Sequence, residues 1–126
     1  MPLVSVSLRR PKTAEFKRQV LNCVHQALVK SGVPQKDVFQ RVFEFAEEDF
    51  IYDAEFPDVA GARDENFVLV EILWSVGRSV KVKRQVLADI CAAYSAAGFD
   101  SEYLMIVFKE TSWENWSFAG GRIMHA

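Results

Sequence analysis

Three residues from distant parts of the chain have side chains or main-chain groups suited to acid–base chemistry: Pro2, Asp37 and Arg78. Met1 is commonly removed when a small residue follows, so we expect the Pro2 nitrogen to become a free secondary amine. Burial and a nearby cation both disfavour the ammonium form of such an amine. It could then serve as a base, an acid or a nucleophile. The alternative is that Pro2 only begins an edge strand, where its missing N–H costs nothing.

The pattern around these residues predicts strands and a helix in the first part of the chain. Val4, Val6 and Leu8 alternate with serines, which is typical of a half-buried strand over residues 2–9. Apolar residues then recur at helical spacing from Thr13, a suitable N-cap, to Gly32. A second strand is expected over about Asp37–Ala46.

The second part of the chain repeats the first. Lys17-Arg18-Gln19-Val20-Leu21 recurs as Lys83-Arg84-Gln85-Val86-Leu87, and 83 − 17 gives an offset of 66 residues. The repeat predicts a third strand at Phe67–Trp74, a helix capped near Ser79 and a fourth strand at Tyr103–Lys109. We therefore expect two βαβ units, each with parallel strands and a right-handed crossover helix.

Two such units are most simply related by a local two-fold axis. The first strand of each unit then lies antiparallel to the other at the centre, which gives an α/β (α+β) fold with a four-stranded mixed sheet. Both helices cover one face. We expect the other face to be apolar and to need a partner. The residues considered for that face are Leu3 or Val4, Phe39 or Val42, and Leu69 or Val70.

One domain is expected over residues 1–126. It divides into repeat 1 at about 2–46, an acidic loop at about 47–65, repeat 2 at about 67–110 and a C-terminal segment at 111–126. The acidic loop carries eight Asp and Glu residues against one cation, Arg63. It is interpreted as a solvated loop held by a few aromatic residues, with a lid or a subunit contact as alternatives.

The expected topology brings the three chemical residues together. In an antiparallel pair, Pro2 at the start of one strand lies near the end of the other, where Arg78 follows. In a parallel pair the starts coincide, so Asp37 lies beside Pro2. Arg78 could bind a carboxylate bidentately, and Asp37 could orient water or a carbonyl group. Alternatively, Arg78 only caps a loop and Asp37 only begins a strand.

Shifting these positions by 66 residues gives a second set made of Val68, Tyr103 and Lys12. This set has no chain terminus and so cannot have a free amine. One catalytic site per chain is expected.

Composition argues against several other classes of protein. The formal net charge is −2, without the basic face that nucleic-acid binding requires. The chain shows neither an apolar run long enough to span a membrane nor a signal peptide. Cys23 and Cys91 are interpreted as reduced thiols, which agrees with a cytoplasmic location. His25 and His125 have no metal-ligand spacing with each other or with the cysteines, so no metal is expected.

Pro2, the βαβ repeat and Gly77-Arg78-Ser79 together resemble the tautomerase superfamily, whose simplest member is 4-oxalocrotonate tautomerase. The fused length is similar to the malonate semialdehyde decarboxylase branch. Two further stretches are similar to that branch: Val33-Pro34 followed by Asp37 and Gln40, and Trp116-Ser117-Phe118 followed by Gly121-Arg122.

The resemblance implies a homotrimer in which Pro2 is the catalytic amine, Asp37 handles water or a carbonyl, and Arg78 anchors a carboxylate. It implies that Trp116 and Phe118 wall the pocket. The implied function is a cofactor-independent isomerase for a small 2-oxo or enol carboxylic acid. The decarboxylase pattern has a second arginine where this chain has Val76, which counts against decarboxylation. A decarboxylase or hydratase, and a non-catalytic trimeric interaction protein, are the alternatives.

Overall fold

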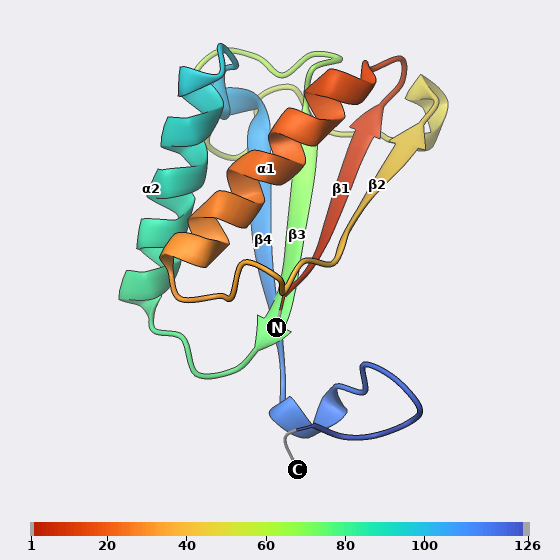
Figure 1. The fold of residues 1–126 in the computed structure, drawn as a ribbon. Coiled ribbons are helices and arrows are strands. Elements are labelled where there is room, and N and C mark those ends of the chain that lie inside the picture. The colour runs from red at the N-terminus through yellow and green to blue at the C-terminus, as the bar shows by residue number, and fades with distance from the viewer. Residues whose placement is uncertain (1, 125–126) are drawn as a thin grey trace.

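The computed structural model describes residues 2–124. The sheet has the order β2-β1-β3-β4, with the β1–β2 and β3–β4 pairs parallel and the central β1–β3 pair antiparallel. Helices α1 and α2 lie together over one face of this sheet (Figure 1). The predicted fold is therefore confirmed. Its strands are β1 (Leu3–Arg9), β2 (Gln40–Phe45), β3 (Val68–Ser75) and β4 (Leu104–Thr111), and its helices are α1 (Ala14–Lys30) and α2 (Val80–Ala96).

The outer strand of each repeat begins later than the sequence suggests. Strand β2 was expected from Asp37, but the Asp37 N–H donates to Pro34 O at 3.0 Å and the strand starts at Gln40. In the second repeat the Tyr103 N–H donates to Asp100 O at 3.1 Å. In both repeats this N–H group is hydrogen-bonded within a turn, so it does not pair with the neighbouring strand.

The core lies between the sheet and the two helices. Alternate residues of β1 and β3 point toward the helices and are almost wholly buried, as the period of two requires. Helix α1 begins where Thr13 Oγ1 accepts the Phe16 N–H at 3.0 Å, and α2 begins where Ser79 Oγ accepts the Val82 N–H at 3.2 Å. The buried sheet residues are Val4, Val6, Leu8, Val68, Val70, Ile72 and Trp74.

The open face of the sheet is mixed in polarity, so the expectation of an apolar face was wrong in part. Leu3 and Leu69 lie on it, but Ser5 and Glu71 are paired between them. Arg41 donates to Ser5 Oγ at 3.0 Å, and Lys109 forms an ion pair with Glu71 at 2.8 Å. Polar groups are tolerated here because they pair with one another across the strands. Of the other candidates, Val4, Val42 and Val70 belong to the side that packs on the core, and Phe39 precedes β2.

The internal repeat continues beyond the last strand of each unit. A short 3-10 helix follows β2 at η1 (Glu47–Asp49), and another follows β4 at η3 (Trp113–Asn115), again 66 residues apart. Their turns are closed by hydrogen bonds of equal length, 3.0 Å, from Asp49 to Ala46 and from Asn115 to Ser112. The start of the acidic loop is thus the structural counterpart of the C-terminal segment.

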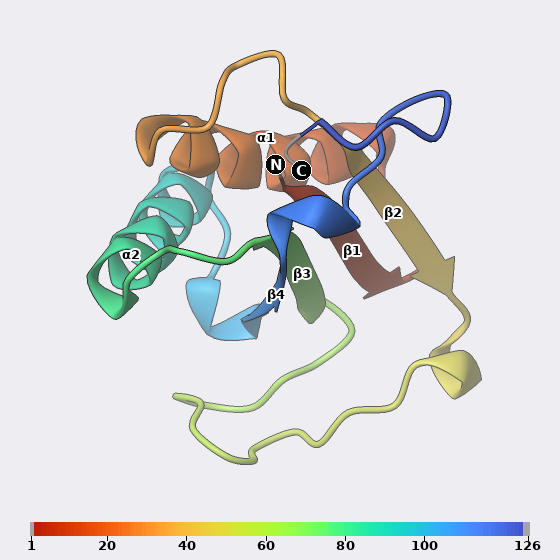
Figure 2. The ribbon, with the colours of Figure 1, turned by 90° about the horizontal axis from the view of Figure 1, so that it is seen from below.

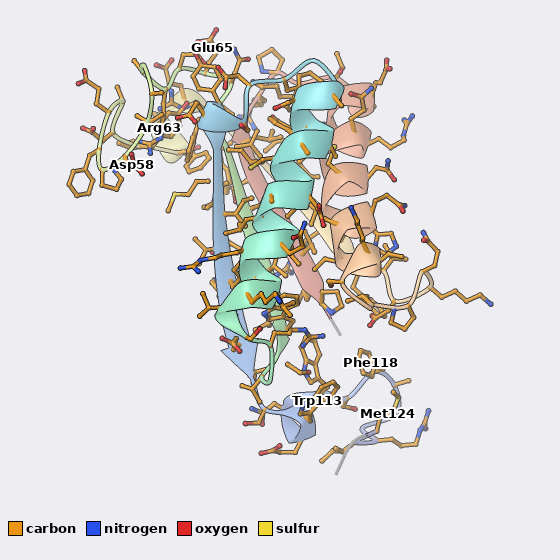
Figure 3. The ribbon with its side chains drawn as sticks, turned by 90° about the vertical axis from the view of Figure 1, so that its left-hand side faces the viewer. Asp58, Arg63, Glu65, Trp113, Phe118 and Met124 are labelled. Carbon is orange, nitrogen blue, oxygen red and sulfur yellow. The ribbon has the colours of Figure 1, made fainter. Side chains whose placement is uncertain are left out.

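Aromatic contacts and one cation hold the acidic loop in place. The Tyr52 ring lies 4.3 Å from the Phe67 ring, and the Arg9 guanidinium stands 4.3 Å over Tyr52. Arg63 donates to the carbonyl oxygens of Asp53 and Phe56. This loop lies at the end of the sheet away from the C-terminal segment (Figure 3). Within residues 2–124, neither helix is long and apolar enough to cross a bilayer.

Candidate active site

A cavity of about 610 Å³ opens at the end of the sheet where β1 begins and β3 ends. The C-terminal segment crosses this end of the molecule (Figure 2). In Figure 3 its residues Trp113, Phe118 and Met124 gather below the strands. The cavity is lined mostly by apolar groups, together with Lys36, Asp37 and Arg78. The remaining lining residues are Gly32, Val33, Pro34, Phe39, Trp113, Phe118 and Met124.

Arg78 is fixed in this cavity by the turn that leaves β3. Gly77 has φ +118°, a conformation that glycine adopts without strain. The Arg78 guanidinium lies 4.3 Å over the Trp74 ring, and its Nη1 donates to Ser75 O at 2.6 Å. Burial lowers the pKa of Arg78, and the carboxylates of Glu110 and Asp37 oppose that shift. The group remains a cation near neutral pH, with donors left for an anion.

Asp37 lies close enough to Arg78 for the two charges to interact. It is half-buried and lines the same cavity, on the turn before β2. The structure thus brings together a guanidinium and a carboxylate that stand 41 residues apart (78 − 37). Lys36, which the sequence analysis missed, adds a second cation to the lining.

Pro2 is buried at the same end of the sheet. The next residue, Leu3, pairs with Leu73, which places Pro2 beside Trp74, the residue under the Arg78 guanidinium. The Val4 N–H donates to Phe39 O at 2.9 Å and so ties the segment after Asp37 to the start of β1. Pro2 itself is not among the residues that line the cavity. It stands just before β1, at the end of the sheet where the cavity opens.

The aromatic wall differs in one respect from the resemblance. Phe118 lines the cavity as expected, and its ring lies 5.8 Å from that of Phe39. Trp116 is not among the lining residues. It instead stacks on Phe118, with ring centroids 5.8 Å apart and planes 5° apart. Trp113, at the start of η3, takes the lining position. The sequence offers one indication of this role, because Trp113 is an aromatic residue soon after the last strand. The direction of its side chain, however, depends on the η3 turn, which the sequence pattern does not predict.

Within the part of the chain that the structure describes, His, Cys, Asp and Glu form no cluster of three or more that could hold a metal ion. The groups available in the cavity are the Arg78 and Lys36 cations, the Asp37 carboxylate and aromatic rings. Such a set can bind a small organic anion and hold its apolar part against the rings.

The family model described as a tautomerase enzyme matches residues 37–119. The matched span is more than half of the chain and includes Asp37, Arg78 and Phe118 but not Pro2. The chain belongs to the tautomerase family.

Three similar proteins extend the match over nearly the whole chain. "Probable tautomerase YusQ" of Bacillus subtilis (strain 168) is 24% identical over 124 residues, covering 97% of this chain and 96% of its own. FG41 malonate semialdehyde decarboxylase inhibited by 3-bromopropiolate has a TM-score of 0.86 at 24% identity, covering 96% of this chain and 92% of its own. A fused 4-OT symmetric trimer has a TM-score of 0.70 at 25% identity, covering 96% of this chain and 94% of its own.

Proposed function

We propose that this chain is a cofactor-independent tautomerase-type isomerase acting on a small 2-oxo or enol carboxylic acid. The observation that carries the proposal is the Arg78 guanidinium in a mostly apolar cavity, beside the buried start of β1. Family membership supports an enzyme of this class.

In the proposed reaction Arg78 holds the carboxylate and polarises the neighbouring oxygen. Removal of Met1 frees the Pro2 nitrogen, and its burial beside a guanidinium favours the neutral amine. The amine takes a proton from the enol hydroxyl or from the α-carbon. It returns that proton to the neighbouring carbon or oxygen, so the reaction moves a proton and a double bond with no net gain or loss of atoms.

Decarboxylation of a 3-oxo acid, or a hydratase reaction that adds water, is the second candidate, and one observation favours it. The decarboxylase structure superimposes better than the fused 4-OT structure, with TM-scores of 0.86 and 0.70. In this candidate Asp37 activates water or polarises the carbonyl. Against it, Val76 stands where the decarboxylase pattern has an arginine, and Val76 does not line the cavity. We therefore place isomerisation first.

We also propose that the protein is a homotrimer. The open face of the sheet carries Leu3, Leu69 and Leu73, which are only half-buried in the single chain. A similar solved protein, the fused 4-OT, is a symmetric trimer. Burying these leucines against neighbouring copies would remove apolar surface from water. A trimer without catalysis is the alternative that the following experiment addresses.

The test combines the intact mass of the protein with two variants assayed for phenylenolpyruvate ketonisation. We expect a mass lacking Met1, and a loss of about 10²–10⁴-fold in kcat/KM for Pro2→Ala. The control inserts one alanine before Pro2, which keeps the ring but makes its nitrogen an amide. We expect the same loss for this variant. Full turnover in either variant, or retention of Met1 on the active protein, contradicts the mechanism.

A further inference from the structure

A second cavity, of about 270 Å³, lies near the opposite end of the sheet, where the turn after β1 meets the segment before β4. It is the counterpart of the first cavity under the 66-residue repeat. Gly98 takes the place of Gly32, Phe99 that of Val33, and Tyr103 that of Asp37. Lys12 takes the place of Arg78. The other lining residues are Phe16, Asn66, Tyr94 and Asp100.

The cation of the second cavity is held in the same way as that of the first. Lys12 Nζ donates to Arg9 O at 2.8 Å, and Arg78 Nη1 donates to Ser75 O at 2.6 Å. In each case the acceptor is the carbonyl three residues earlier, at the end of a central strand. An ammonium group has three donors, so Lys12 can still bind an anion in the cavity. Its other contact within residues 2–124 is a longer one, 3.4 Å, to Pro11 O.

The counterpart of Asp37 is a hydrogen-bond donor rather than a carboxylate. Tyr103 and Asp37 close equivalent turns, with N–H to carbonyl distances of 3.1 Å and 3.0 Å. Tyr103 is half-buried and Asn66 is exposed, and both line the cavity. A hydroxyl group, a side-chain amide and an ammonium group therefore border one small cavity.

Aromatic rings form the rest of the cavity. The Phe99 ring lies 4.9 Å from Phe16 in an edge-on arrangement and 5.2 Å from Tyr94. Tyr94 is only 2% exposed. Such a surface suits the apolar or aromatic part of a ligand.

Acidic groups nearby are already engaged. The Asp100 carboxylate accepts the Glu102 N–H at 2.9 Å, and the Glu102 carboxylate accepts the Ala60 N–H at 2.7 Å. These hydrogen bonds hold both carboxylates on backbone N–H groups.

We propose that the second cavity binds a small aromatic carboxylic acid, with its carboxylate on Lys12 and Tyr103. It does not convert this acid, because Val68 within the chain stands where the first repeat has Pro2.

The experiment titrates the full-length protein with phenylacetate, a carboxylic acid with no ketone to enolise, and follows backbone amide signals by NMR. The Arg78→Ala background weakens the first cavity and isolates the second. In this background we expect saturable shifts at Lys12, Phe99 and Tyr103. Lys12→Met in the same background should weaken binding about tenfold, the effect of losing a hydrogen bond to a charged group.

Two further variants keep the test informative. Tyr103→Phe removes only a hydroxyl group and should weaken phenylacetate binding several-fold. Its result does not depend on whether the turn that carries Lys12 changes in the Lys12 variant. Lys12→Arg keeps the charge and should retain most of the affinity. The proposal is wrong if phenylacetate shifts only amides that line the first cavity, or if Lys12→Met and Tyr103→Phe both bind as the background does.

The second site is independent of the catalytic proposal. Full activity in Pro2→Ala with saturable binding at Lys12 would overturn the proposed function alone. Loss of activity in Pro2→Ala with no binding at Lys12 would overturn the second site alone.

Discussion

Replacing Arg78 by alanine should remove most substrate binding. The guanidinium is held over Trp74 at 4.3 Å and by Ser75 O at 2.6 Å, so it is already in place when the substrate arrives. Truncating one partner of a buried, hydrogen-bonded charge pair costs about 2–5 kcal/mol. Because Arg78 is half-buried, the lower part of that range applies. We expect about 2–3 kcal/mol, a loss of roughly 30- to 150-fold in kcat/KM, mainly through a higher KM.

The assay is steady-state ketonisation of phenylenolpyruvate, with two reference variants. Arg78→Lys keeps a positive charge but loses the planar pair of donors, so its activity should fall between those of the wild type and the alanine variant. Arg84→Ala removes an exposed arginine from the nearby helix α2 and should behave as the wild type. An Arg78→Ala enzyme that is folded and has an unchanged KM would refute the assignment of Arg78 as the carboxylate anchor.

Three other variants probe the site and the core. Asp37→Asn should cost less than about tenfold in ketonisation but more than about a hundredfold in any decarboxylase or hydratase activity, because only the latter use the carboxylate. Equal losses in both assays would contradict this division. Trp113→Ala should raise KM for phenylenolpyruvate about five- to tenfold by removing an aromatic contact from the cavity wall, and an unchanged KM would exclude that contact. Burial raises the pKa of Tyr94 to about 12, so folding favours its neutral form. The contribution of Tyr94 to the free energy of unfolding, about 2–3 kcal/mol, is complete below the unfolded-state pKa near 10. It is lost as the pH rises toward 12. Urea unfolding from pH 8 to pH 11.5 should show this decline in the wild type but less of it in Tyr94→Phe. Identical declines would mean that other groups dominate.

The architecture could be predicted from the sequence because two strong patterns agree. The alternation of Val4, Val6 and Leu8 defines a strand with one buried side, and the 66-residue repeat supplies its partner in β3. The repeat also determines the order of the strands, and that order places Asp37 and Arg78 at the same end of the sheet. That convergence needs no knowledge of side-chain conformation, and the structure shows it for these two residues.

The details that could not be predicted depend on local turns and on pairing across strands. Asp37 lies in a turn because its N–H donates a hydrogen bond to Pro34 O. The periodicity of apolar residues does not predict this hydrogen bond. The choice of Trp113 over Trp116 as a lining residue depends on the direction of the chain through η3. The polar content of the open face depends on pairs such as Ser5 and Arg41, which become visible only when register is known.

The exposed link at Gly61 joins two units that are each complete in their local structure. A chain cut there would keep each parallel strand pair and its crossover helix within one fragment. The fragments would have the β1–β3 pairing and the shared core to reassemble them. If the second fragment began with proline in place of Val68, a new imino terminus would stand near Lys12 and Tyr103. Such a split protein would offer an amine at both ends of the sheet.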